Sequence, residues 1–336
     1  MADHNAKFLD WARLALAAYA LRQPRITFLG HSDNITFRVE EQDGALYLLR
    51  LHQPSLQIWN GVRQLPEFIA SELTWLEALA DGGFPVQHPI RTRAGDLVAR
   101  LQPEGATLPA TLLTWMEGRH FSAQAPDAAA EIEQFGVLVG QLHDFSSHWL
   151  PPAGFARPSY DEDHFRRIFA RLLRGVDLGI FSQEDYWTLR AACREIYRQI
   201  SLLPVQPETW GVVHADLHVG NFLVQTEREC QETRIIPIDF SFCGFGHYLF
   251  DLSVLLAGGL SAALRPAFLR GYRAVRPLLD DELRAVEAYA LAGKLSYFAY
   301  QIDNPAERAW LQRRIPEVAQ NDCARFLSDN LTAPAR

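Results

Sequence analysis

A short polar run in the second half of the chain decides its fold, His214-Ala215-Asp216-Leu217-His218-Val219-Gly220-Asn221. A second run begins fifteen residues after Asn221, with three apolar residues followed by an aspartate, Ile236-Pro237-Ile238-Asp239-Phe240. Short apolar runs at 212–213, 222–224 and 235–238 predict strands, so both polar clusters lie at strand ends. Two carboxylates and an amide held in this way suit a hard cation, because Mg²⁺ prefers a few oxygen ligands together with water and substrate phosphates.

The residues before this site predict a small sheet with one inserted helix. A helix is expected over 7–21, and two runs rich in β-formers, 35–39 and 46–51, flank an Asp-Gly pair that is typical of a hairpin. A second helix is expected from Pro66 to about Ala80, and further strands over 96–101 and 110–116. Residues 25–116 therefore indicate a β-rich part.

The chain then becomes mostly helical. Apolar residues at helical spacing run from Ile132 to Leu142, and further helices are expected from Asp161 to Gly175, over 182–200 and over 280–300. The β-like block 211–240 interrupts these helices, an arrangement that presents polar loops on a rigid platform.

The pattern His-x-Asp-x4-Asn, followed by a strand that ends in Asp-Phe, resembles the catalytic loop and metal-binding Asp of the protein-kinase-like fold. The form Asp-Leu-His-x-Gly-Asn is similar to the branch of aminoglycoside phosphotransferases and choline kinases, which phosphorylate small molecules. The resemblance covers nearly the whole chain. It implies an α+β, bilobal fold: a β-rich N-lobe with one inserted helix over 1–116, and a larger, mainly helical C-lobe over 117–336 with the catalytic loop, the metal site and the acceptor pocket.

The resemblance assigns roles to five residues of the two motifs and their support. Asp216 would be the catalytic residue that orients the acceptor hydroxyl, and Asn221 and Asp239 would hold Mg²⁺ on the nucleotide phosphates. Asp251 matches the buried Asp that braces the catalytic loop, and His214 would support the loop by hydrogen bonds. Phosphoryl transfer depends chiefly on alignment and charge neutralisation, which these groups would supply.

The fold also requires a cation on its third strand and a glutamate on the inserted helix. The two lysines do not fit, because Lys7 precedes the sheet and Lys294 lies in a late helix. Arg50 occupies the strand position instead, a departure from the protein-kinase pattern, although its fork of donors suits phosphate. Glu72 is the expected partner of Arg50, since the other glutamates of that helix lie in its first turn or further along.

Two further nucleotide contacts are expected. The phosphate-covering loop has no Gly-x-Gly-x-x-Gly, and its place is taken by a segment with one glycine, whose N–H groups could still meet phosphate: Gly30, Ser32 and Asn34. The hinge that would meet the adenine follows the strand 112–116 and comprises Trp115, Met116 and Glu117.

Composition excludes several other classes of protein. The 336 residues carry 32 basic and 40 acidic side chains, a net charge of −8, with no basic stripe that would indicate a nucleic-acid partner. The four cysteines are too widely spaced for a Cys-x-x-Cys site, and no apolar segment reaches the ~20 residues of a membrane span. We therefore expect a cytoplasmic protein with reduced thiols, without a membrane or nucleic-acid partner.

The remaining polar groups have simpler interpretations than metal binding. His214 and His218 have the spacing of a zinc pair, but their place in a loop and the lack of a third ligand favour structural roles. The acidic run 161–164 is better explained as a solvated helix N-terminus than as a metal site.

The expected function is transfer of the γ-phosphoryl group of ATP or GTP, with Mg²⁺, to a hydroxyl of a small molecule such as an amino alcohol, amino acid, sugar or antibiotic. One alternative is an atypical Ser/Thr protein kinase, but only 11 residues separate Asp239 from Asp251, too few for a peptide-docking segment. The other is a non-catalytic nucleotide-binding interaction module, which the joint presence of Asp216, Asn221 and Asp239 disfavours. Residues 117–336 carry 22 basic and 28 acidic side chains, which mildly favours a cationic acceptor.

Overall fold

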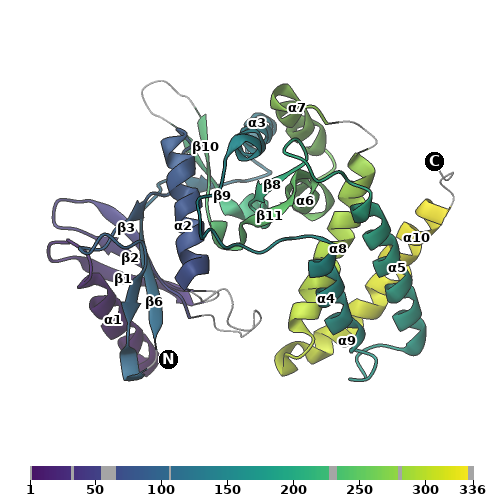
Figure 1. The fold of residues 1–336 in the computed structure, drawn as a ribbon, viewed down its shortest axis with the longest axis horizontal. Coiled ribbons are helices and arrows are strands. Elements are labelled where there is room, and N and C mark those ends of the chain that lie inside the picture. Colours follow the sequence, from purple (N-terminus) through teal and green to yellow (C-terminus); the bar gives the residue numbers. More distant parts are fainter. Residues whose placement is uncertain are drawn as a thin grey trace. The chain divides into compact units, whose positions relative to one another are not determined.

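The computed structural model describes residues 2–31, 34–53, 66–105, 107–226, 233–278 and 282–331. Two compact units make up the chain. The first comprises residues 1–120, 151–157 and 223–241, and the second comprises residues 121–150, 158–222 and 242–336. Figure 1 shows the order of the helices and strands along the chain.

The first unit is built on an antiparallel sheet with the strand order β1-β2-β3-β6-β4, in which β5 also pairs with β6. Its strands are β1 (Arg25–His31), β2 (Ile35–Glu40), β3 (Leu46–Leu51), β4 (Pro89–Ile90), β5 (Ala99–Leu101) and β6 (Leu108–Thr114). The predicted hairpin is confirmed: β2 pairs with β3, and Gly44 takes the left-handed φ of +90° that an L side chain rarely adopts while its N–H donates to the carbonyl of Glu41.

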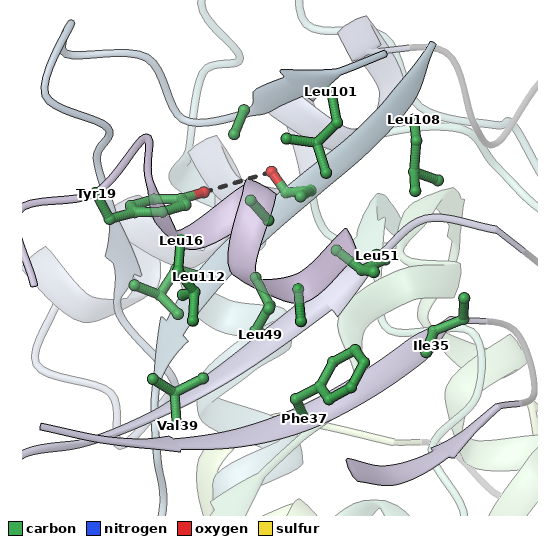
Figure 2. Packing of buried hydrophobic residues seen from close by; sticks show 14 of the residues in the cluster. Leu16, Tyr19, Ile35, Phe37, Val39, Leu49, Leu51, Leu101, Leu108 and Leu112 are labelled. Atoms are coloured by element: carbon green, nitrogen blue, oxygen red, sulfur yellow. Dashed lines mark hydrogen bonds between the residues drawn. The ribbon is translucent and has the colours of Figure 1, made fainter. Parts of the chain in front are cut away.

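Helix α1 (Ala2–Leu16) packs with the sheet on a common core. In β2 every second residue is buried, so Ile35, Phe37 and Val39 enter this core (Figure 2). Burying such side chains contributes roughly 1.5–3 kcal/mol each. Our prediction that the helix extends to residue 21 is wrong: it ends at Leu16, because the chain turns there and Tyr19 enters the core, with its hydroxyl donating to the carbonyl of Ala110 at 3.4 Å.

Helix α2 (Pro66–Asp81) confirms the inserted helix. Proline suits the first turn, where its missing N–H would have no helical partner. The helix buries an apolar set together with one acid, Glu72.

A second, smaller sheet in the order β10-β9-β7 consists of β7 (Arg119–His120), β9 (Phe222–Thr226) and β10 (Thr233–Pro237).

The second unit is mainly helical, as predicted. Its helices are α3 (Ala128–His148), α4 (Glu162–Leu173), α5 (Gln183–Ser201), α6 (Tyr248–Val254), α7 (Arg265–Val275), α8 (Leu283–Gln301), α9 (Arg308–Val318) and α10 (Ala324–Leu331). Local capping confirms two predicted starts, since Asp161 caps α4 and Ser182 forms a capping box on α5. A strand pair, β8 (Trp210–Val213) with β11 (Gly244–His247), lies among these helices.

Helices α3 and α7 lie side by side (Figure 1), and glycines allow their close approach. A Cβ atom added at Gly136 would lie 2.1 Å from the carbonyl oxygen of Phe268, and one at Gly271 would lie 1.9 Å from that of Glu133. Only a residue without a side chain fits at these positions. The sequence analysis did not predict α7, α9, α10, β1 or β11.

Within the described ranges, no helix combines the length and the apolar character needed to cross a membrane.

Candidate active site

Strand β8 delivers the polar run that the sequence analysis singled out. After Val213 the chain enters a loop in which Ala215 has a left-handed φ of +65°, a conformation that costs an L residue about 1–2 kcal/mol. The carboxylate of Asp251 on α6, which is 1% exposed, holds this loop. It accepts hydrogen bonds from the backbone N–H of His214 at 2.9 Å and of Ala215 at 2.7 Å. Asp216 follows directly, so its backbone position depends on these two bonds.

Asp251 has a third partner that the sequence analysis missed. His143 on α3 places its Nε2 3.1 Å from Asp251 Oδ2 and its Nδ1 3.0 Å from the hydroxyl of Tyr272 on α7. Burial lowers the pKa of His143, although the bond to Asp251 acts in the opposite direction. A neutral ring beside a carboxylate donates from Nε2, so its Nδ1 accepts from Tyr272. The only sequence signal was a histidine on the buried face of a predicted helix.

Asn221 locks the side chain of Asp216. Its Nδ2 donates to both the backbone oxygen and Oδ2 of Asp216, each at 2.9 Å. Asn221 is buried at the end of a short 3₁₀ turn, Val219–Asn221, that His218 caps by accepting from the N–H of Gly220 at 3.0 Å. The amide nitrogen is thus engaged within the loop, which leaves the oxygen Oδ1 as the atom that Asn221 can offer to a cation.

The first unit holds a buried ion pair between Arg50 on β3 and Glu72 on α2, with Nη2 and Oε1 2.8 Å apart. Both side chains are 5% exposed or less. The two residues that the sequence paired are therefore in contact, whereas Glu77 forms an ion pair with Arg91. The Nε of Arg50 is buried and, within the described part of the chain, has no hydrogen-bond partner, a donor that an anion could satisfy.

Asp239 follows β10 in the first unit and also has a left-handed φ, of +63°. Its Oδ1 accepts a hydrogen bond from the hydroxyl of Ser241 at 2.7 Å, so its second oxygen remains for another partner. Asp216 and Asn221 belong to the second unit. Asp239 in the first unit and Asn221 in the second each offer an oxygen of the kind that Mg²⁺ accepts, so each side chain by itself fits that ion.

The remaining predicted residues that the structure describes lie in β1, directly before β2 and in the link that follows β6. Gly30 lies in β1 beside an irregularity in the β1–β2 register, and Asn34 directly precedes β2, whereas Ser32 lies outside the described residues. The expected hinge forms the link between β6 and β7, where Trp115 donates its N–H to the carbonyl of Leu46 at 3.0 Å; the other two residues are Met116 and Glu117.

The acidic run 161–164 has the structural role that its sequence predicted, at the N-terminus of a helix. Asp161 Oδ1 accepts from the N–H of His164 at 2.8 Å as a helix cap. Across the described ranges, no group of three or more His, Cys, Asp or Glu side chains could hold a metal ion.

The fold and these loops define a class, the protein-kinase-like phosphotransferases, with an antiparallel N-terminal sheet, helix α2 and a mainly helical C-terminal part. The model of the phosphotransferase enzyme family (APH) matches residues 25–289, and the chain belongs to this family. It is a small-molecule kinase that acts on a hydroxyl group. The predicted family and fold class are confirmed.

Two relatives illustrate the sequence similarity. Amicoumacin kinase of Bacillus subtilis (strain 168) is 24% identical over 301 residues, which cover 88% of this chain and 77% of that protein. A homoserine kinase of Cupriavidus metallidurans is 25% identical over 324 residues, 89% of this chain and 88% of that one.

Two solved structures share the fold. The microcompartment-associated aminopropanol kinase has a TM-score of 0.75 and 24% identity over 96% of this chain and 98% of its own. Amicoumacin kinase hAmiN, in complex with AMP-PNP, Ca²⁺ and Ami, also has a TM-score of 0.75, with 19% identity over 94% of this chain and 93% of its own.

Proposed function

We propose that this protein transfers the γ-phosphoryl group of ATP to a hydroxyl of a small molecule that also carries an amine, with Mg²⁺ as the cation and GTP as a second donor to be tested. The observation that carries the proposal is the Asp216 carboxylate, fixed by Asn221 and placed by a loop that Asp251 holds. A carboxylate restrained in this way can orient a hydroxyl without reorganising during the reaction.

In this proposal Asp216 accepts a hydrogen bond from the acceptor hydroxyl. The pKa of an alcohol lies far above 7, so Asp216 aligns the oxygen first and takes its proton late, as the new phosphorus–oxygen bond forms and the bond to the leaving ADP oxygen breaks. Asn221 Oδ1 and the second oxygen of Asp239 would hold Mg²⁺, which neutralises phosphate charge when bound. His214 and Asp251 keep the loop in place.

On the nucleotide side, the Arg50–Glu72 pair would present a guanidinium to the phosphates. The Nε of Arg50, which is buried and has no hydrogen-bond partner among the described residues, supports this role, since such a donor is costly unless a ligand satisfies it. Backbone groups of Gly30, Ser32 and Asn34 would cover the phosphates. Backbone groups at Trp115, Met116 and Glu117 would meet the base.

Two observations support a small, amine-bearing acceptor. The span between Asp239 and Asp251 is taken up by a 3₁₀ turn (Phe240–Phe242), by β11 and by the start of α6, which leaves no separate segment for docking a peptide. Residues 117–336 carry 22 basic and 28 acidic side chains, a net charge of −6, which favours a cationic acceptor. The acceptors named for the relatives include homoserine and aminopropanol.

The test uses Asp216→Asn, which keeps the shape of the side chain. Acceptor-dependent ADP release should fall at least about 100-fold, while the nucleotide Kd stays within a few-fold, because Asp216 acts on the acceptor. The matched control is Asp163→Asn, an exposed acid in the first turn of α4, which should retain activity. Undiminished turnover in Asp216→Asn would contradict the assigned role.

The acceptor class is tested with a panel of amino alcohols, hydroxy amino acids and aminoglycosides, each beside an analogue without the amine, and with a generic protein substrate. Amine-bearing acceptors should give the higher kcat/KM with ATP. Equal rates for the amine-free analogues, or phosphorylation of the protein substrate alone, would overturn the proposed acceptor.

A further inference from the structure

A short segment far from both motifs belongs to the first unit. Residues 151–157 lie between α3 and α4 in the sequence, yet they pack in the unit that holds the sheet and α2. The backbone N–H of Ala156 donates to Ser71 Oγ at 2.9 Å, and that hydroxyl donates to the carbonyl of Glu67 at 2.7 Å. The segment is therefore anchored on the first turns of α2.

Arg157, at the end of this segment, links two other parts of the unit. Its Nη1 donates to the carbonyl of Phe68 on α2 at 3.0 Å, and its Nη2 donates to the carbonyl of Ser241 at 2.6 Å. The side chain is 9% exposed. The planar guanidinium holds its donors in a fixed fork, so these two bonds set the position of one carbonyl relative to the other.

Each of those two carbonyls belongs to a residue that is close to a residue of the proposed nucleotide site. Phe68 precedes Glu72 by one helical turn, and Glu72 pairs with Arg50. Ser241 donates its hydroxyl to Asp239 Oδ1 at 2.7 Å. A single guanidinium thus joins the helix that carries the ion pair to the loop that carries Asp239.

The loop at Asp239 needs such support. Its φ of +63° lies in the left-handed region, which an L residue holds only when its surroundings fix it. The hydroxyl of Ser241 fixes the side chain of Asp239, and Arg157 fixes the backbone of Ser241. Without Arg157, the carboxylate would still have its serine partner, but the bond between the guanidinium and the carbonyl of Ser241, which leads to α2, would be lost.

We propose that Arg157 is a positioning residue for nucleotide binding: it fixes the Asp239–Ser241 loop on α2, so that the second oxygen of Asp239 is placed for the cation of the cation–nucleotide complex. This inference rests on the proposed function, in which Asp239 holds Mg²⁺. In this proposal Arg157 acts through the loop and needs no contact of its own with nucleotide or metal. Its contribution therefore appears in the part of nucleotide affinity that depends on Mg²⁺.

The experiment measures the Kd of ADP calorimetrically with and without Mg²⁺, for the wild-type chain and for Arg157→Lys. Lysine keeps the charge and removes the fork. The factor by which Mg²⁺ raises the affinity for ADP should be about tenfold smaller in the variant than in wild type, because a displacement near 1 Å is enough to weaken a site strongly. The Kd of ADP without Mg²⁺ should stay within about twofold of wild type.

The matched control is Arg93→Lys. Arg93 also lies in the first unit and donates from Nε to a backbone carbonyl, that of Tyr19, at 3.0 Å. Among the described residues, it makes no hydrogen bond to α2 or to the Asp239–Ser241 loop. It should keep the full Mg²⁺-dependent gain. An equal loss in both variants would mean that any arginine–carbonyl bond of the unit matters, and would overturn the proposal.

A second variant keeps the proposal testable if Arg157→Lys fails to fold. Ser241→Ala removes the hydroxyl that joins the loop to Asp239 and should reduce the same Mg²⁺-dependent gain. In folded double variants the two losses should not add, since both act through one loop. Additive losses, or an unchanged gain in either folded single variant, would overturn it. A wild-type chain that binds ADP without any Mg²⁺-dependent gain would instead refute the proposed metal site, and this inference with it.

Discussion

The carboxylate of Asp251 gives the sharpest test of how the fold holds the loop that carries Asp216. In Asp251→Asn, one of two acceptor oxygens becomes an NH₂ group. In the wild-type chain, Oδ2 of Asp251 contacts His214 and His143, and Oδ1 accepts from the N–H of Ala215 at 2.7 Å. If the remaining oxygen of the asparagine contacts His214 and His143, its NH₂ group faces the N–H of Ala215, and two donors then meet. A hydrogen bond to a charged group contributes about 1.5–3 kcal/mol, and a buried donor without a partner costs about 1–3 kcal/mol. We therefore expect a loss of about 3–5 kcal/mol in the free energy of unfolding, the range for breaking a buried charged network.

The same substitution should also affect catalysis. The left-handed backbone at Ala215 costs about 1–2 kcal/mol, which its bond to Asp251 offsets. Losing that bond lets the loop relax, and the competent population should fall about 5- to 30-fold, a factor that corresponds to 1–2 kcal/mol. The kcat should fall by this factor, while the nucleotide Kd changes little.

Urea unfolding and steady-state kinetics measure the two effects. Asp144→Asn is the matched control, because this aspartate is 58% exposed and its charge partner is 3.7 Å away. Its stability should change by less than about 1 kcal/mol. If Asp251→Asn were as stable and as active as this control, the loop would not depend on Asp251 and the reasoning would be refuted.

Three further predictions concern packing and charge. Glu72→Gln leaves its arginine partner buried and unpaired, so urea unfolding should show a loss of about 3–5 kcal/mol; a change below 1 kcal/mol would mean that the pair contributes little. Gly136→Ala should lower the Tm, because its Cβ would lie 2.1 Å from a carbonyl oxygen of α7. The control is Gly293→Ala on α8, whose Cβ would have nothing within 4 Å, so that higher helix propensity should raise stability by up to about 1 kcal/mol. A change of Tm in the same direction in both variants would contradict the packing argument. Burial lowers the pKa of His247 from 6.5 to about 4, so the unfolded chain binds the extra proton between these values and stability falls as the pH drops through them. From pH 7 to pH 5 His247 should account for a loss of about 2 kcal/mol in urea unfolding, which His247→Gln should remove; an unchanged pH slope in that variant would rule out the assignment.

The elements that the sequence predicted well are those with local causes. The β2–β3 hairpin follows from an Asp-Gly turn, and α2 begins at a proline and ends before a glycine pair. Helices α4 and α5 begin at Asp161 and Ser182, whose side chains cap the first turn. In each case the deciding residues lie within a few positions of one another.

Predictions failed where a distant contact overrides local preference. Helix α1 ends at Leu16 because Tyr19 turns into the core of the sheet and its hydroxyl reaches Ala110, 91 residues away. Helix α7 was also not predicted, although it buries residues at helical spacing, Ala267, Phe268, Gly271 and Tyr272. It packs closely on α3, where a Cβ atom added at Gly271 would lie 1.9 Å from the carbonyl oxygen of Glu133. The contact between Tyr19 and Ala110 leaves no periodic trace in the sequence.

By itself, the sequence determined the class of protein, because the spacing of Asp216, Asn221 and Asp239 is a property of two short segments and of the strands around them. Tertiary structure decided what holds those residues in place. His143 lies 108 positions from Asp251, and Arg157 lies 84 positions from Ser241. The geometry of a hydrogen bond requires only that two groups meet in space, so partners of this kind become visible only when packing brings their segments together.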